Sequence, residues 1–163
     1  MVGSYANDAE QVVRILMERG WHIAFAESCT AGMCAAHLVD VPDASRVLNV
    51  SFVTYAESAK TEYLAVPPET IERYGVVSEE VAAAMASGCA AKADCEVAVG
   101  VTGYAGPSGG TDKAPVGTVC FGFSVNGGIT TVTRHFGAIG RAEVRTAACN
   151  FAFSELLRLL TER

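Results

Sequence analysis

The stretch Ala26-Glu27-Ser28-Cys29-Thr30-Ala31-Gly32 contains the strongest candidate for a catalytic group. An apolar run ends there in small polar residues and resumes as an Ala-rich helical pattern, which is typical of a turn from a strand into a helix. Such a turn presents Ser28 at the amino end of a helix, where free backbone N–H groups and the helix dipole favour negative charge. Ser28 could therefore be a nucleophile beside an oxyanion site. The alternative is that Ser28 or Thr30 only caps the helix.

A hydroxyl and an amine follow the next apolar run. Tyr55 ends that run, and Lys60 lies in the short helical pattern after it. A lysine acts as a general base only if burial or neighbouring positive charge lowers its pKa from about 10.4. The pattern predicts a Ser-Lys site in which Lys60 activates Ser28 and Tyr55 relays or holds the proton. The alternative places Lys60 on a solvated helix face.

A glycine-rich loop, Gly103-Tyr104-Ala105-Gly106-Pro107-Ser108-Gly109-Gly110, is the second candidate for a site. Its glycines permit backbone N–H groups to converge on an anion, although it is not a Walker loop. Lys113 follows it, and Arg141 and Arg145 lie one helical turn apart near the start of the last helix. That spacing is suited to gripping a phosphate group. The alternative is ordinary surface charge.

Cys29 is a competing candidate for the nucleophile. However, none of His22, His37 and His135 falls in an obvious partner motif, so we expect Cys29 to pack as a small hydrophobe. The six cysteines contain no C-x-x-C pair. We therefore expect neither a zinc site nor a disulfide framework, and no metal or cofactor.

Composition limits the class of protein. The chain has 163 residues, half of them apolar, so we expect one domain over residues 1–163 with a well-buried core. The formal net charge is −6 and Lys and Arg do not cluster, so nucleic acid is not an expected partner. No stretch approaches the roughly 20 apolar residues of a membrane helix, and the amino terminus does not resemble a signal peptide. These features predict a cytoplasmic protein that does not bind membranes.

Hydrophobic periodicity and turn signals predict alternating helices and strands. The expected helices follow Asp8 up to Arg19 and cover residues 31–39, 56–64, 78–92 and 141–160, with a brief helix after the break at Pro67-Pro68 that ends at Tyr74. The expected strands cover residues 21–26, 46–55, 96–102, 117–125 and 129–136, with a hairpin at Asn126-Gly127-Gly128. This order predicts a three-layer α/β/α sandwich on a mixed, mostly parallel sheet. Ligands of such sheets bind beyond the carboxyl ends of the parallel strands, which brings together the loops at Ser28, Tyr55 and Gly103.

Five motifs in the same order carry a resemblance to a known family. They are Ala-Glu-Ser-Cys-Thr-Ala-Gly, Phe-Val-Thr-Tyr-Ala-Glu-Ser-Ala-Lys, Val-Val-Ser-Glu-Glu-Val, Thr-Gly-Tyr-Ala-Gly-Pro-Ser-Gly-Gly and Pro-Val-Gly-Thr-Val. With them the chain resembles the CinA C-terminal domain family over nearly its whole length. That family includes stand-alone nicotinamide-nucleotide amidohydrolases.

The resemblance implies an amidohydrolase that converts nicotinamide mononucleotide to nicotinate mononucleotide and ammonia. Ser28 takes the position of the nucleophile, Lys60 that of its base and Tyr55 that of an assisting hydroxyl. The expected substrate-binding residues are Thr30, Gly32, Thr102, Gly103, Gly106, Gly109, Gly110, Arg141 and Arg145. The family also suggests a homo-oligomer. A second hypothesis is a nucleotide-binding or interaction module of the same fold that has lost turnover.

Several positions differ from the family pattern, although Ser28, Tyr55 and Lys60 are intact. Ala31 stands where a second glycine is usual, and Gly140 replaces an acid before Arg141. Three further differences lie at Thr102, just before the glycine-rich loop, and at Tyr104 and Ser108 within it. We expect these changes to affect the shape of the pocket and the preference for substrate more than the hydrolytic groups.

Overall fold

A five-stranded mixed sheet forms the centre of the protein. A computed structural model describes residues 3–162. The strands lie in the order β2-β1-β3-β4-β5. Their bounds are β1 Ile23–Glu27, β2 Phe52–Val53, β3 Val97–Gly103, β4 Thr118–Val125 and β5 Gly128–His135. Strand β1 is parallel to β2 and β3, whereas β4 is antiparallel to β3 and β5. Four strands therefore run in one direction and β4 runs against them.

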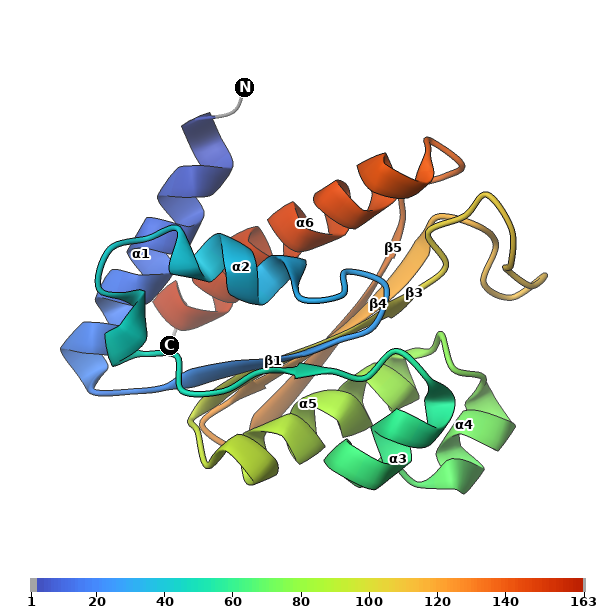
Figure 1. Ribbon diagram of the computed structural model, residues 1–163, viewed down its shortest axis with the longest axis horizontal. Coiled ribbons are helices and arrows are strands. Elements are labelled where there is room, and N and C mark those ends of the chain that lie inside the picture. The colour runs from blue at the N-terminus through green and yellow to red at the C-terminus, as the bar shows by residue number, and fades with distance from the viewer. Residues whose placement is uncertain (1–2, 163) are drawn as a thin grey trace.

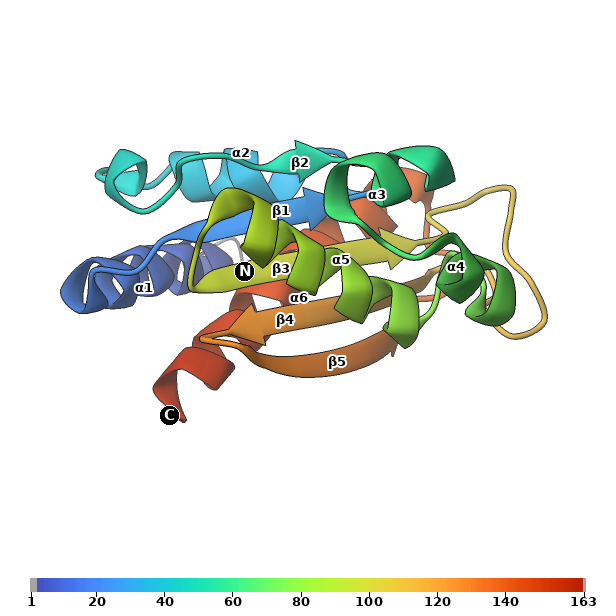
Figure 2. The same ribbon diagram turned by 90° about the horizontal axis from the view of Figure 1, so that it is seen from below.

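Helices cover both faces of the sheet (Figures 1 and 2). One face carries α1 Gly3–Arg19, α2 Met33–Val39 and α6 Arg141–Thr161. The other carries α3 Glu57–Leu64, α4 Pro68–Tyr74 and α5 Glu79–Ala93. The predicted three-layer α/β/α sandwich is confirmed. Across residues 3–162, no helix combines the length and the apolar character that a membrane span requires.

The two helical layers pack on the sheet in different ways. On the α6 side large rings fill the core, and the Phe25 and Phe153 ring centroids lie 5.8 Å apart. On the α5 side the helix approaches the strand backbones closely. Gly100 and Gly122 are paired in register on β3 and β4, and a Cβ on Gly122 would lie 2.2 Å from the Ala82 carbonyl oxygen. The Ala-rich helix and these glycines therefore determine how closely α5 lies on the sheet.

The predicted strand 46–55 is wrong over most of its length. A short 3₁₀ helix, Ala44–Arg46, occupies its start, and regular pairing is limited to β2. Between them the chain follows β1 at single points: Leu48 bridges Ile23, and the Ser51 hydroxyl accepts the Phe25 N–H at 3.0 Å. Because a side chain takes the place of a ladder bond at this sheet edge, β-branched residues alone do not produce a long strand here.

The other predicted elements are present with shifted ends. Helix α1 begins at Gly3 rather than at residue 8, and α2 begins at Met33 because Ala31 and Gly32 have φ of 49° and 93°, outside the helical region. The predicted hairpin joins β4 to β5 through Asn126 and Gly127, both with positive φ. The Ser78 hydroxyl accepts the Val81 N–H at 3.2 Å and caps α5. The existence and order of these helices and strands could therefore be predicted from the sequence, whereas their first and last residues were less predictable.

Candidate active site

A cleft of about 320 Å³ opens beyond the carboxyl ends of β1 and β3. Its lining residues come from the loops after β1, β2 and β3 and from the start of α6, as the topology rule predicts. Figure 1 shows that these segments lie at the same end of the sheet. Of the residues predicted from the sequence, the cleft is lined by Ser28, Tyr55, Lys60, Thr102, Gly103, Gly106 and Arg141. The structure does not place Thr30, Gly32, Gly109, Gly110 or Arg145 in its walls.

Ser28 and Lys60 meet at the floor of this cleft. Lys60 Nζ lies 3.2 Å from Ser28 Oγ, although the two residues come from different loops. The same nitrogen donates to the Thr54 carbonyl at 2.7 Å and to the Tyr55 carbonyl at 3.2 Å. Ser28 is 8 % exposed and Lys60 is 0 % exposed. The solvated-face alternative for Lys60 therefore does not hold, because the amine is inside the protein and touches the serine.

Burial lowers the pKa of the Lys60 amine below its usual 10.5. Removal from water disfavours the charged form of a lysine, and this is the largest effect here. The negative charge of Glu57, at the start of α3, acts in the opposite direction and raises that pKa. Neither of the two ion pairs found in residues 3–162 involves Lys60, since both belong to Arg158. Burial therefore makes the neutral, basic form of the amine easier to reach than in a lysine exposed to water.

Cys29 follows the serine but has the wrong environment for a nucleophile. Its thiol is buried, and burial raises its pKa to about 12. A thiol with that pKa is protonated near neutral pH and reacts slowly, because the thiolate is the nucleophile. The structure thus supports the expectation that Cys29 packs.

Glu27 is a site residue to which the sequence reasoning gave no role. Its carboxylate is fully buried and accepts the N–H groups of Gly32, Cys34 and Ala35 at 3.0–3.1 Å. It therefore caps α2 from inside the protein and fixes the turn that carries Ser28. A clue was available, since the motif places an acid a few residues before the start of α2 at Met33. Gly32 thus uses its N–H within the protein, and neither Ser28 nor Thr30 caps α2 by its side chain.

Tyr55 and Arg141 form one wall of the cleft. The Tyr55 side chain is 59 % exposed, and its hydroxyl accepts a hydrogen bond from Arg141 at 3.0 Å. Arg141 also donates to the Gly106 carbonyl at 2.8 Å, and so ties the start of α6 to the glycine loop. The contact of Tyr55 with Lys60 is through its carbonyl. Its predicted role in proton relay is therefore not supported by a direct contact of its hydroxyl with the amine.

Arg145 holds the serine turn from behind. Its Nε donates to the Cys29 carbonyl at 2.8 Å, and another guanidinium nitrogen donates to the Thr30 carbonyl at 3.2 Å. These bonds fix the turn from the α6 side, as Glu27 does from within. The spacing of Arg141 and Arg145 therefore gives them different positions: Arg141 lines the cleft, and Arg145 supports the turn that carries Ser28.

The loops around the cleft contain free backbone donors. Within residues 3–162, the N–H groups of Cys29 and Thr30 have no hydrogen-bond acceptor in another residue, and the Cys29 N–H meets only its own thiol. In the glycine loop the N–H groups of Gly106, Ser108 and Gly109 also have no acceptor among the residues that the structure describes. Such donors suit an oxyanion or a phosphate. In contrast, Lys113 lies outside this cleft and lines a neighbouring hollow.

The departures from the family pattern have local explanations. Ala31 adopts φ 49°, a conformation that glycine tolerates and alanine does not favour. Thr102 is buried and uses its hydroxyl to donate to the Val76 carbonyl at 2.8 Å, which a serine could also do. Gly140 has φ 116° before the first residue of α6.

In the described part of the chain, no group of three His, Cys, Asp or Glu side chains could hold a metal ion.

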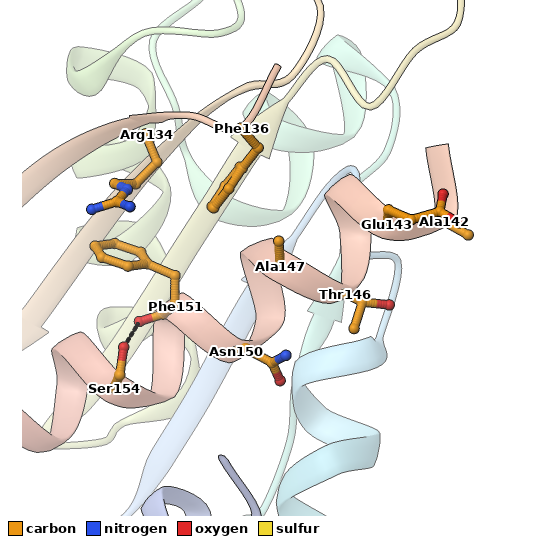
Figure 3. A pocket seen from close by; sticks show the side chains of 9 residues that line it. All are labelled: Arg134, Phe136, Ala142, Glu143, Thr146, Ala147, Asn150, Phe151 and Ser154. Atoms are coloured by element: carbon orange, nitrogen blue, oxygen red, sulfur yellow. Dashed lines mark hydrogen bonds between the residues drawn. The ribbon is translucent and has the colours of Figure 1, made fainter. Parts of the chain in front are cut away.

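A larger groove, of about 480 Å³, lies between α6 and the end of β5 (Figure 3). It contains Arg134 and Phe136 from β5 and its end, and Phe151 and Ser154 from α6. Arg134 lies over the Phe151 ring, 4.8 Å from its centroid, and the Ser154 hydroxyl donates to the Phe151 carbonyl at 3.0 Å. We refer to this hollow as the α6 groove. None of the predicted site residues lines it.

Known proteins match this chain over most of its length. The model of the CinA C-terminal domain family matches residues 6–160. A putative competence-damage inducible protein of Limosilactobacillus reuteri is 45% identical over 152 residues, which are 92% of this chain and 36% of that protein. A CinA-like protein of Mycobacterium marinum is 44% identical over 163 residues, 97% of this chain and 38% of that protein. The chain thus spans little more than a third of these relatives.

Solved structures agree over almost the whole chain. A competence-damaged protein (CinA) superfamily protein from Escherichia coli has a TM-score of 0.92 and 36% identity, and the match covers 96% of this chain and 90% of that one. A competence/damage inducible protein from Agrobacterium tumefaciens gives a TM-score of 0.92 and 35% identity, with 96% of each chain covered. The chain, with its Ser28–Lys60 pair at the carboxyl edge of the sheet, belongs to the CinA C-terminal domain family.

Proposed function

We propose that this protein is an amidohydrolase that deamidates nicotinamide mononucleotide to nicotinate mononucleotide and ammonia. Ser28 attacks the carboxamide carbon, and Lys60 takes the proton of the Ser28 hydroxyl. The acyl-enzyme forms as ammonia leaves, with the proton returned by Lys60, and water then releases the acid. The observation that carries the proposal is the buried contact of 3.2 Å between Lys60 Nζ and Ser28 Oγ.

The three neighbours of Lys60 Nζ suit the neutral amine. A neutral amine has two N–H donors and one lone pair. The Thr54 and Tyr55 carbonyls can only accept, so they take the two N–H groups. The lone pair is then directed to the remaining neighbour, Ser28, whose hydroxyl can donate to it. The two carbonyls thus orient the base towards the nucleophile.

The developing negative charge requires donors next to the nucleophile. The Cys29 and Thr30 N–H groups, which have no acceptor in another residue within residues 3–162, are the candidates. Glu27 and Arg145 hold the turn that presents them. The donors at the start of α2 cannot serve in the same way, because the Glu27 carboxylate occupies them.

The substrate phosphate is assigned to the other end of the cleft. There the free N–H groups of the glycine loop accompany the guanidinium of Arg141. A protein with a net charge of −6 must supply local positive charge to hold a nucleotide, and these groups do so. This assignment predicts that nicotinamide riboside, which lacks the phosphate, is a poorer substrate.

One observation also favours a second function, a nucleotide-binding module without turnover. If Lys60 is charged, its three N–H donors match the same three acceptors, so the amine would be a buried crosslink between two loops. Such a protein would bind the nucleotide in the same cleft but would not cleave it.

Ammonia release separates the two functions. The protein is incubated with nicotinamide mononucleotide, free ammonia is measured by a coupled assay, and the acid product is identified by mass spectrometry. Binding of the same nucleotide to the Ser28→Ala variant is measured by calorimetry. We expect release of ammonia and acid in equal amounts by the unmodified protein only. Binding without release would support the silent module.

A further inference from the structure

A second hollow, of about 390 Å³, adjoins the catalytic cleft. Val77 and Tyr104 line both hollows, so the two share one wall. Its other walls come from the end of α4 and from the turn of residues 111–114, and they carry Arg73 and Lys113. Each hollow lies near the lower end of the range for small-molecule pockets, roughly 300–1,000 Å³, so a ligand that enters both has room for two connected groups.

The shared wall is well fixed. The Tyr104 N–H donates to the Thr118 carbonyl at 3.0 Å, and its carbonyl accepts the Gly117 N–H at 2.7 Å. Its ring packs against the small buried cluster around Val77 and lies under Gly109, where an added Cβ would be 3.3 Å from Tyr104 Cδ1. The ring is half-buried and therefore offers an aromatic surface between the two hollows.

The second hollow contains more positive than negative charge. Lys113 lies on a turn that is closed by the Thr111 N–H to the Ala114 carbonyl at 2.9 Å and by the Ala114 N–H to the Thr111 hydroxyl oxygen at 3.0 Å. That hydroxyl keeps its own proton for donation. Arg73 lies over the Tyr74 ring at 5.2 Å. Within residues 3–162 neither cation forms an ion pair, and Asp112 is the one acid among the lining residues that the structure describes.

We infer that this hollow is an accessory subsite that admits pyridine dinucleotides, with Arg73 and Lys113 facing the phosphate of the second nucleotide half. The inference rests on the proposed function, in which the nicotinamide half occupies the cleft at Ser28. A dinucleotide has a second nucleoside phosphate joined to the first phosphate. Compared with the mononucleotide, it therefore has one more anionic group and one more base. The two cations and the Thr111 hydroxyl match the anionic group, and the rings of Tyr104 and Tyr74 match the base.

The experiment compares the mononucleotide with nicotinamide adenine dinucleotide. The double variant Arg73→Ala/Lys113→Ala removes two exposed cations from the hollow. The matched control, Lys92→Ala/Arg134→Ala, removes the same net charge from other surfaces. Calorimetry gives the Kd of both nucleotides in a Ser28→Ala background, where no turnover interferes, and kcat/KM is measured with Ser28 intact.

We expect the Arg73→Ala/Lys113→Ala variant to weaken the dinucleotide by roughly ten- to a hundredfold in Kd and in kcat/KM, because charge-assisted hydrogen bonds are lost. The mononucleotide and the control variant should change little. An equal loss of affinity for both nucleotides would place the first phosphate in this hollow and overturn the inference. An unchanged Kd for the dinucleotide would also overturn it. If neither nucleotide releases ammonia, the proposed function fails, and the Kd comparison alone still decides the subsite.

Discussion

The cleft at Ser28 and the α6 groove each contain a serine and a cation, but they use them differently. The α6 groove is the larger, at about 480 Å³ against about 320 Å³. Its serine, Ser154, bonds to a carbonyl of its own helix, and its Arg134 lies over an aromatic ring. In the cleft the buried amine of Lys60 touches the Ser28 hydroxyl. Under the proposed function, desolvation and mutual orientation, rather than the size of a hollow, distinguish the Ser28 hydroxyl from that of Ser154.

The largest expected effect is that of Ser28→Ala. Loss of the nucleophile should lower the rate of ammonia release by roughly a thousandfold or more, because the neighbouring Cys29 thiol, whose pKa burial raises to about 12, is a poor substitute. The change in Tm should be small, since the serine does not cap α2. The comparison is made by steady-state assay and thermal unfolding.

The matched control is Ser154→Ala in the α6 groove, which removes only a local helix bond and should keep full activity. Comparable loss of activity in both serine variants would contradict the assignment of the cleft. Strong inactivation by Cys29→Ala with an intact fold would instead move the nucleophile to Cys29.

Lys60→Met should lower kcat by roughly 10²- to 10⁴-fold, the usual contribution of a general base. The apolar side chain fills the same buried space, so the variant should fold, although two carbonyls lose a donor. Lys92→Met, in the last turn of α5 and exposed, is the matched control and should be fully active. If Lys60→Met retains activity while Ser28→Ala loses it, the base is a different group.

The same lysine predicts a pH dependence. Only the neutral amine can accept the serine proton, so activity should rise with pH through a midpoint below 10.5, because burial lowers the pKa of Lys60. Between that midpoint and pH 10.5, Lys60 binds more protons in the unfolded chain than in the folded one. The contribution of Lys60 to the free energy of unfolding should therefore also rise with pH. Both slopes should be absent in Lys60→Met. A rate profile that is flat over this range in the unmodified protein would exclude Lys60 as the base.

Substitutions of the two arginines of α6 should have different effects on catalysis. Arg141→Ala removes a cation from the cleft and should lower kcat/KM for the mononucleotide by roughly tenfold, with little effect on the riboside. Arg145→Ala loosens the turn behind Ser28 and should lower kcat for both compounds alike. Arg134→Ala in the α6 groove is the control. An identical pattern for Arg141→Ala and Arg145→Ala would remove the distinction between phosphate binding and positioning.

The smallest expected effect is that of Ala31→Gly. Alanine at φ 49° is strained, so glycine there should raise the free energy of unfolding by up to about 1 kcal/mol, with activity unchanged. Ala36→Gly, on the exposed side of α2, should lower the free energy of unfolding by roughly 0.5–1 kcal/mol, because that position is helical. Urea unfolding measures both variants. A decrease for Ala31→Gly would mean that the turn is not strained.

Local patterns determined most of the fold. Helix and strand periodicity, the cap at Ser78 and the turn at Asn126 act over a few residues, so the order of elements and the sandwich could be predicted from the sequence. The short length of β2 within residues 46–55 could not be predicted in this way. There the Phe25 N–H donates to the Ser51 hydroxyl, and this bond depends on a strand that is distant in the sequence.

The sequence by itself determined which residue types stand at the carboxyl edge of the sheet, including Ser28 and Lys60. Only the tertiary structure decided what they do. Burial of Lys60 depends on how α3 packs, and this burial changes its pKa. The inward turn of Glu27, and the different directions taken by Arg141 and Arg145 from one helix, follow from contacts across more than one element. Such contacts depend on the packing of distant segments, which residue spacing within one segment does not encode.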